Sequence, residues 1–435
     1  MPRHLSSVAS AFIVILAASV SLAHAESAAV TDDTASDALL GPVFSATGPG
    51  AAVYGAAAGF PPPAPGTRRG SSLPLENLVG AYSHFDELSS SRPLRRASAP
   101  WLFKRAPEPT ISYKFGSNRF GIETYLGRNP VTGLLIARDD TILYEHYQYA
   151  RSDRDRLLSQ SMAKTITAML IGIAVSESKI RSIDEPASAY VPGLANTEYG
   201  RTPIRDLLLM SSGVAFAENY DGSDDIAKLS RDLFAEPGKG PIASVAQFNT
   251  RIAPPGSKWN YSSADTEVLG LVLRAAIGEP IADYLREKIW QAIGTEADAS
   301  WAIDSSGQEA TFCCFNAVLR DYARLGRLLA HDGAWEGQQV IPRQWLFDAT
   351  TVNPANAYLA PRTATSYFGY GYQVWILPGA QRQFALIGIR GQMILVDPAS
   401  KLVMVHTAVR QKPAEPAAFA ETIALWLGVV EQLGH

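Results

Sequence analysis

The stretch that decides how this chain folds is Leu157-Leu-Ser-Gln-Ser-Met-Ala-Lys164, which continues into Thr165-Ile-Thr-Ala-Met-Leu-Ile-Gly-Ile-Ala-Val175. The apolar second part predicts a buried helix. Ser161 and Lys164 lie three residues apart at its start, so they share one helix face. A serine needs a neighbouring base before it attacks a carbonyl carbon, and burial lets a lysine act as that base. The spacing therefore predicts a nucleophile at Ser161 and its base at Lys164.

The same spacing occurs again at the far end of this helix, in Ser176-Glu-Ser-Lys179. There the helix dipole and Glu177 keep Lys179 charged and solvated. The first copy instead has an apolar helix behind it and free N–H groups that suit a developing oxyanion. We therefore expect chemistry at Ser161 and none at Ser176.

A tyrosine follows in Tyr261-Ser-Ser263, between a Pro-Pro-Gly turn and a helix predicted over residues 266–277. A phenol near the nucleophile can pass a proton to the leaving group. Taken alone, Tyr261 is one of 17 tyrosines, most of which pack in cores. Its predicted role as proton relay therefore depends on Ser161.

Near the C-terminus, Gly388-Ile-Arg-Gly-Gln392 is predicted to lie on a strand. Glycine in a strand allows a ligand or another backbone to approach closely. The backbone N–H of Gln392 is the predicted second oxyanion donor, together with that of Ser161. Arg390 is a candidate for binding a substrate carboxylate, with a solvated surface charge as the alternative.

The remaining pattern predicts an α/β (α+β) fold. Residues 133–147 form a predicted hairpin around Asp139-Asp140. The simplest architecture is one antiparallel sheet built from both ends of the chain and flanked by helices, with an all-α lobe inserted at roughly residues 180–340. Further helices are predicted over residues 204–210, 246–251, 316–331 and 422–433, and strands over 370–376, 384–389, 393–396 and 402–408.

The N-terminus predicts export. Arg3 and His4 precede a short apolar run and an Ala-x-Ala site, which is typical of a signal peptide over residues 1–25, cleaved after Ala25. An uncleaved anchor is the alternative. Residues 26–70 are rich in Ala, Pro and Gly and predict a disordered leader. The hydrolase domain would then occupy residues 71–435 in a periplasmic or secreted protein.

Composition narrows the possible partners. The 435 residues are 47% hydrophobic and 18% charged, with a net charge of −4 and no sustained basic block. We therefore expect no nucleic-acid partner and no stable membrane span, and a monomer or homodimer. No histidine pattern suggests a metal, and no cofactor is expected. The only two cysteines, Cys313 and Cys314, are adjacent: they are either buried thiols or a strained disulfide and redox-switch candidate.

Several phrases together resemble one superfamily, the serine β-lactamases and penicillin-binding proteins. The wording is most similar to the branch of 6-aminohexanoate-dimer hydrolases and class C-like esterases, over roughly residues 110–430. The phrases are Ser159-Gln-Ser-Met-Ala-Lys164, Leu209-Met-Ser-Ser-Gly213, Tyr220-Asp-Gly-Ser-Asp224, Arg320-Asp-Tyr-Ala-Arg-Leu-Gly326 and Gly391-Gln392 ahead of Val396-Asp-Pro398.

This resemblance implies an α/β sandwich lobe and an all-α lobe with the site between them. It implies Ser161 as the acylated nucleophile, Lys164 as its base and Tyr261 as the relay. Tyr220 matches a second tyrosine that lies on the substrate side of the cleft in the dimer hydrolases.

The chain also departs from the penicillin-recognising pattern. Ser263 stands where those proteins usually carry Asn, and Ile389, Arg390 and Gly391 stand where they carry Lys-Thr-Gly or Lys-Ser-Gly. The lysine that would hold a β-lactam carboxylate is missing, which argues against β-lactamase or D-Ala-D-Ala carboxypeptidase activity. An uncharged Ile389 beside the cleft suits small linear amides or esters.

Two alternatives stand beside an amide hydrolase. One is a carboxylesterase with little amidase activity, because both activities use the same nucleophile and oxyanion hole. The other is a non-catalytic periplasmic receptor on a hydrolase scaffold, which would lack a reactive Ser161.

Overall fold

The computed structural model describes residues 41–64, 73–235 and 238–435. The predicted signal peptide, its cleavage site after Ala25 and the first part of the predicted leader lie outside these residues.

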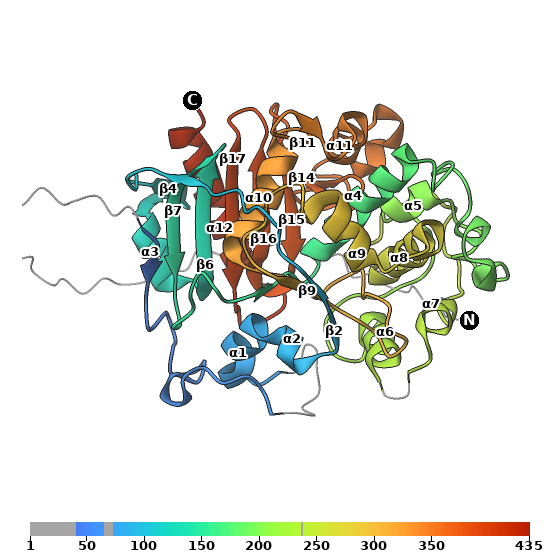
Figure 1. Cartoon of the computed structure of the whole chain (residues 1–435), viewed down its shortest axis with the longest axis horizontal. Coiled ribbons are helices and arrows are strands. Elements are labelled where there is room, and N and C mark those ends of the chain that lie inside the picture. Colours follow the sequence, from blue (N-terminus) through green and yellow to red (C-terminus); the bar gives the residue numbers. More distant parts are fainter. Residues whose placement is uncertain (1–40, 65–72, 236–237) are drawn as a thin grey trace, which may run out of the picture.

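A nine-stranded sheet forms one half of the molecule (Figure 1). Its order is β1-β7-β6-β17-β16-β15-β14-β13, and β3 also pairs with β7. β1 and β3 run parallel to β7, and the other pairs are antiparallel. The strands are β1 Val43–Phe44, β3 Lys104–Arg105, β6 Val131–Arg138, β7 Thr141–Tyr147, β13 Gly369–Tyr370, β14 Trp375–Ile376, β15 Phe384–Gly388, β16 Gln392–Asp397 and β17 Leu402–Ala408.

The sheet joins the two ends of the domain. The β6–β7 hairpin turns at Asp139, whose φ of 52° lies in the left-handed region. β6 then pairs with β17, so that Arg138 lies opposite Leu402. The predicted fold class, a mixed α/β structure with an antiparallel sheet flanked by helices, is confirmed.

Both faces of this sheet are buried, which explains its nearly continuous apolar strands. Leu135 and Val405 belong to a core on the face covered by α10 (Leu319–Ala330). Leu134 and Met404 point the other way, into a core shared with Trp426 of α12 (Pro416–Leu433). Successive side chains of a strand alternate between faces, so one run of residues supplies two cores.

The helical half lies beside the sheet, on the right in Figure 1. Its centre is α4 (Met162–Ser176), which packs on α8 (Ser263–Ile277). Gly278 ends α8 with a φ of 76°, as C-terminal glycines commonly do. The other α-helices are α1 Leu78–Ser83, α2 Phe85–Leu88, α3 Ile122–Arg128, α5 Ile204–Leu208, α6 Asp225–Phe234, α7 Pro241–Ala246, α9 Ile281–Leu285 and α11 Arg343–Thr350.

Small strand pairs complete the framework. A four-stranded sheet has the order β2-β9-β10-β8 and leads directly into α4. Its strands are β2 Ser91–Leu94, β8 Leu157–Leu158, β9 Ala299–Ala302 and β10 Phe315–Ala317. Two further pairs are β4 Ser112–Phe115 with β5 Asn118–Gly121, and β11 Ala334–Trp335 with β12 Gln338–Gln339.

The structure corrects several sequence predictions. Residues 41–64 of the predicted disordered leader are ordered, because Tyr54 and Phe60 are buried against Tyr149. Residues 246–251 are not a helix, since α7 ends at Ala246. Residues 370–376 form two short strands rather than one. The Gly388–Gln392 motif forms a turn between β15 and β16 and not a strand interior.

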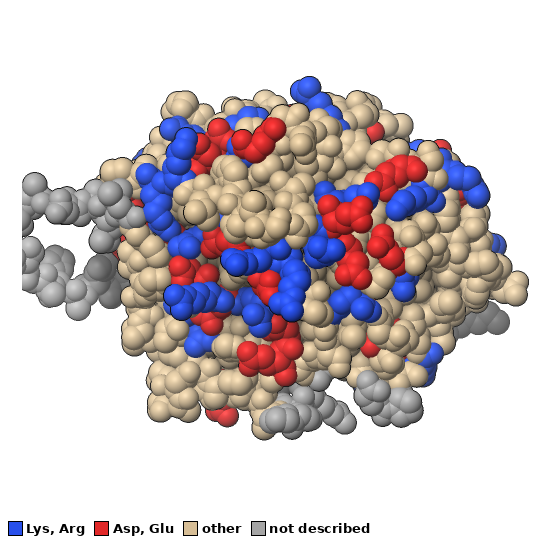
Figure 2. Space-filling model, in the orientation of Figure 1, with Lys and Arg blue, Asp and Glu red and all other residues tan. Residues whose placement is uncertain are grey.

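The visible surface carries both charge signs. Figure 2 shows Lys and Arg interspersed with Asp and Glu over the face of the sheet half and the adjoining helices. Within the described ranges, no helix combines the length and apolar character that crossing a bilayer requires.

Candidate active site

The turn before α4 is held by the small sheet. The backbone N–H of Ser159 donates to the Phe315 carbonyl at 2.7 Å, and the Phe315 N–H donates to the Ser159 hydroxyl at 3.0 Å. Gln160 then takes a φ of 46°, and Ser161 becomes the N-terminal cap residue of α4. The left-handed conformation of Gln160 produces a sharp turn between strand β8 and helix α4. Ser161, which is partly exposed, is thereby set at the end of a rigid element.

Lys164 is buried one turn further along α4, with 2% of its surface exposed. Its ammonium group donates to three oxygens: the Ser161 hydroxyl at 3.3 Å, the Ser263 hydroxyl at 2.9 Å and the Phe312 carbonyl at 2.9 Å. Among the residues that the structure describes, no carboxylate pairs directly with this nitrogen. The predicted contact between Ser161 and Lys164 is therefore present, and Ser263 and Phe312 complete the surroundings of the amine.

Burial lowers the pKa of Lys164 to about 8, while the charges of Glu218, Glu267 and Asp265 act in the opposite direction. A lysine with this pKa is partly neutral close to neutral pH. Neutral acceptors satisfy its N–H groups without stabilising the charged form as strongly as a carboxylate would.

Tyr261 lies against the same lysine. The Lys164 nitrogen is 5.2 Å from the centre of the tyrosine ring. Burial raises the pKa of Tyr261 above its ordinary value, the Glu218 charge adds to this, and a hydrogen bond with Ser161 opposes it. The Tyr261 ring stacks on Trp375 at 5.4 Å between centroids and forms an aromatic wall with Trp259 and Tyr370. Tyr261 is therefore neutral, and its ring is fixed beside Ser161 and Lys164.

Glu218 connects these groups, although the sequence pattern did not predict a role for it. Its carboxylate accepts from the Ser263 N–H at 2.7 Å, the Ser263 hydroxyl at 2.9 Å and the Tyr220 hydroxyl at 2.8 Å. The Ser263 proton is thus committed to Glu218, which leaves its lone pairs to Lys164. Glu218 lies in a loop two residues before the Tyr220 phrase, with no periodicity to identify it.

Tyr220 is therefore part of the same network. It is partly buried, and its φ of 60° and the bond from its N–H to Asp224 at 2.6 Å hold the loop in place. Burial raises the pKa of Tyr220 well above its ordinary value, with Glu218 contributing. Its hydroxyl stays protonated and donates to Glu218.

The Gly388–Gln392 turn lies next to the nucleophile turn. A Cβ on Gly388 would come within 2.6 Å of the Ser159 carbonyl, so only glycine allows this approach. Ile389 is partly exposed, and Gly391 has a φ of 97°. The Gln392 side chain donates to the Ala408 carbonyl at 2.6 Å and so anchors the turn on β17.

Arg390 does not fit the role predicted for it. Only 3% of its surface is exposed, and its guanidinium donates to the carbonyls of Arg410, at 2.6 Å, and Gln411. The two carbonyls satisfy a charge that would otherwise be costly to bury. We therefore replace substrate binding by a framework role, in which Arg390 holds the chain that follows β17.

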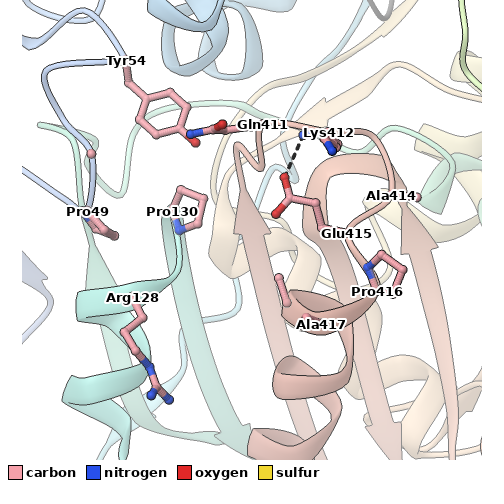
Figure 3. Close-up of a pocket in the computed structure, with 12 residues that line it drawn as sticks. Pro49, Tyr54, Arg128, Pro130, Gln411, Lys412, Ala414, Glu415, Pro416 and Ala417 are labelled. Carbon is pink, nitrogen blue, oxygen red and sulfur yellow. Dashed lines mark hydrogen bonds between the residues drawn. The ribbon is translucent and has the colours of Figure 1, made fainter. Parts of the chain in front are cut away.

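One surface pocket lies away from this network. A pocket of about 580 Å³ is lined by Arg128, Lys412 and Glu415 among others, and by none of Ser161, Lys164 or Tyr261. Figure 3 shows its Glu415 carboxylate bonded to the Lys412 backbone, at 2.7 Å, and Arg128 pairs with Glu421. Among the residues that the structure describes, no group of three or more His, Cys, Asp or Glu is arranged to hold a metal ion.

Fold and site together define a serine hydrolase. The family model described as Beta-lactamase matches residues 122–425, which is well over half of the chain. The chain therefore belongs to the beta-lactamase family, as its sequence phrases predicted.

Individual relatives agree with this placement. The 6-aminohexanoate-dimer hydrolase of Paenarthrobacter ureafaciens is 25% identical over 345 residues, which cover 78% of this chain and 83% of that protein. A solved Bacillus anthracis protein, provisionally assigned as a 6-aminohexanoate-dimer hydrolase, has a TM-score of 0.74 at 23% identity and covers 82% of this chain and 94% of its own. The hydrolase EstCE1, with promiscuous acyltransferase activity, has a TM-score of 0.55 at 16% identity over 69% and 93%.

Proposed function

We propose that this serine hydrolase cleaves small linear amides or esters through an acyl-enzyme formed on Ser161. The observation that carries the proposal is the set of hydrogen-bond partners around the Lys164 nitrogen. A neutral amine has two N–H groups and one lone pair. The Phe312 carbonyl can only accept, and Ser263 has its proton committed to Glu218, so these two oxygens take the two N–H groups. The lone pair is then left for the Ser161 hydroxyl.

In the first step, Lys164 takes the proton of Ser161 while the serine oxygen bonds to the substrate carbonyl carbon. The carbonyl oxygen becomes an oxyanion, for which the backbone N–H groups of Ser161 and Gln392 are the proposed donors. The position of Ser161 at the N-terminus of α4 supports this, because the helix dipole favours negative charge there.

In the second half of acylation, the proton must reach the leaving nitrogen or oxygen. Tyr261 is the proposed relay: burial keeps its hydroxyl protonated, it gives that proton to the leaving group, and it takes up in exchange the proton held by Lys164, whose nitrogen lies 5.2 Å from the centre of its ring. Water then attacks the acyl carbon and gives up a proton to the Lys164–Tyr261 pair. The bond between this carbon and the Ser161 oxygen breaks, the serine oxygen takes the proton back, and the acid leaves.

The residues near Ser161 and Tyr261 support the proposed substrate class. Ile389 is uncharged, Arg390 is buried, and the partly exposed rings of Trp259 and Trp375 lie beside Tyr261. These residues favour an unbranched apolar chain with no essential carboxylate at the Ile389 position. The name of the relative from Paenarthrobacter ureafaciens supports an amide dimer as the substrate. The resemblance to the dimer hydrolases is the support for Tyr220 as a substrate-binding residue.

A carboxylesterase with little amidase activity is the second candidate. It is favoured by a solved structure described as a family VIII carboxylesterase, which has a TM-score of 0.54 at 15% identity. Relatives named as D-alanyl-D-alanine carboxypeptidase and beta-lactamase match only 38% and 40% of this chain. A receptor without catalysis remains the alternative of a different class.

We also propose that the protein is exported to the periplasm or medium. The support is the sequence of residues 1–25, with its basic start, apolar run and Ala-x-Ala site.

The test is covalent labelling of the intact protein with a fluorophosphonate, followed by peptide mapping. Label on Ser161, absent in Ser161→Ala, supports the acyl-enzyme hydrolase, and an unlabelled protein contradicts it. A panel of p-nitrophenyl esters, 6-aminohexanoate dimer and nitrocefin then ranks the candidates. Turnover of the esters without the dimer would favour the carboxylesterase, and fast nitrocefin turnover would overturn the interpretation of Ile389.

A further inference from the structure

The segment 310–315 contains the only two cysteines of the chain, and they are joined to each other. Cys313 and Cys314 form a disulfide between neighbouring residues, with their Cα atoms 3.7 Å apart. The bond closes a small ring across their shared peptide, and each residue is 6% exposed. Cys314 has a φ of 68°, a left-handed conformation that a non-glycine residue rarely adopts. Opening the ring would therefore free this peptide to move toward ordinary backbone angles.

On one side of the disulfide, the segment holds the proposed base. The carbonyl of Phe312, the residue before Cys313, accepts from Lys164 at 2.9 Å. Thr311 is fixed in turn by α8, because its hydroxyl donates to the Thr266 carbonyl at 3.0 Å. A Cβ on Gly270 would lie 2.3 Å from that hydroxyl, so helix and segment are in close contact.

On the other side, the segment holds the turn of the nucleophile. Phe315, the residue after Cys314, exchanges two hydrogen bonds with Ser159, at 2.7 and 3.0 Å. Ser159 lies two residues before Ser161. The disulfide thus lies between the carbonyl that orients Lys164 and the strand that orients Ser161.

The cysteine carbonyls are themselves tied to β9. The Trp301 indole N–H donates to the Cys313 carbonyl at 2.9 Å, and the Ala302 N–H donates to the Cys314 carbonyl at 3.1 Å. A rotation of the peptide between the two cysteines would break the first of these bonds and displace the neighbouring Phe312 carbonyl.

We propose that Cys313–Cys314 is a redox modification site, at which a small dithiol switches the enzyme to a less active form. The reaction is thiol–disulfide exchange: the dithiol is oxidised to its own disulfide, the Cys313–Cys314 bond breaks, and both sulfurs gain protons as thiols. The consequence is loss of the Phe312 carbonyl from its place at Lys164. This inference rests on the proposed function, because it acts through the Ser161–Lys164 pair.

The test compares the native protein before and after treatment with dithiothreitol, without denaturant. Three quantities are measured: alkylation of Cys313 and Cys314 by mass, far-UV circular dichroism, and the rate at which a fluorophosphonate labels Ser161. We expect two alkylatable thiols, an unchanged spectrum and a labelling rate about 10 to 100 times lower, because small misplacements of catalytic groups have effects of this size. Reoxidation with diamide should restore the rate.

The matched variant is Cys313→Ser/Cys314→Ser, which cannot form the bond. It should label slowly and be insensitive to dithiothreitol, which assigns the effect to these sulfurs. An unchanged labelling rate in fully reduced protein overturns the proposal, and so does a native protein whose disulfide does not react with dithiothreitol. If the oxidised protein itself is not labelled, the proposed function fails and this inference fails with it, whereas fast labelling in both states sinks the redox site alone.

Discussion

Helix α4 carries the same Ser-x-x-Lys spacing at both ends, and only the surroundings differ. At the N-terminal end, Lys164 is buried among neutral acceptors. At the C-terminal end, the Ser176 hydroxyl donates to the Ile173 carbonyl of its own helix at 2.7 Å. Lys179 has 33% of its side chain exposed and pairs directly with Glu177 at 3.4 Å. A tyrosine is present at both ends as well, since the centre of the Tyr284 ring lies 4.8 Å from the Lys179 nitrogen.

The two ends therefore contain the same residue types, a serine, a lysine, a tyrosine and a glutamate. What separates them is the distance of the carboxylate from the amine and the access of water. Glu218 reaches Lys164 only through Ser263, whereas Glu177 touches Lys179 itself. Burial among neutral oxygens allows the amine of Lys164 to release its proton. The far end of α4 thus supplies a matched control for each residue of the proposed site.

The largest expected effect comes from the two serines. Ser161→Ala should lower kcat for a p-nitrophenyl ester by about 10³-fold or more, because no acyl-enzyme can form. Ser176→Ala should leave kcat unchanged, since Ser176 only bonds within its helix. Steady-state kinetics on both variants measure this difference. Wild-type activity in Ser161→Ala, or loss of activity in Ser176→Ala, would contradict the assignment of the nucleophile to Ser161.

The two lysines should differ nearly as much. Lys164→Met keeps the length of the side chain but removes the proposed base, and we expect kcat to fall by about 10² to 10⁴-fold. Lys179→Met should have no effect on kcat. Thermal unfolding of both variants separates loss of the base from loss of the fold: a folded Lys164→Met protein with full activity would show that another group takes the serine proton.

The tyrosines test the relay. Tyr261→Phe keeps the stacking on Trp375 but removes the hydroxyl, and turnover of an amide should fall by about 10²-fold. A p-nitrophenyl ester should lose less, because its leaving group departs without being protonated. Tyr284→Phe should change neither rate. Equal losses on amide and ester would contradict a role for Tyr261 in protonating the leaving group.

Substitution of the two glutamates should give the smallest effect, which is measured in the pH dependence of kcat/KM. Lys164 must be neutral to act, so kcat/KM should rise with pH up to its pKa of about 8. The Glu218 charge raises the pKa of Lys164, so Glu218→Gln should move this acid limb to lower pH, by about one unit. Glu177→Gln should leave the profile in place. If the acid limb of the pH profile did not move in Glu218→Gln, Glu218 would have no influence on the pKa of Lys164.

The sequence carried the framework of the site because that framework is local. The β6–β7 hairpin, the apolar helix behind Ser161 and the i, i+3 contact to Lys164 each depend on neighbouring residues. The contacts that set the chemistry are distant in sequence: Glu218, Ser263 and the Phe312 carbonyl come from three other segments, and loops leave no periodicity. Arg390 shows the opposite error, a function predicted where the structure shows a framework contact. Its charge in a glycine-rich motif suggested that it binds substrate, but it donates to backbone carbonyls that follow β17.

The ordering of residues 41–64 was missed for a related reason. Their Ala, Pro and Gly content is typical of disorder, and only contacts with distant residues, Tyr54 and Phe60 on Tyr149 and β1 on β7, make them part of the fold.

The pairing of β6 with β17 also has a consequence for the order in which the site is assembled during synthesis. β6 is made early in synthesis, but its partner is almost the last part of the domain to be made. At ordinary translation rates the delay is roughly tens of seconds. Ser161 and Lys164 are therefore complete long before the turn at Gly388–Gln392 exists to close their site, and the unfinished chain has a serine and a lysine but no enclosed place for them to react.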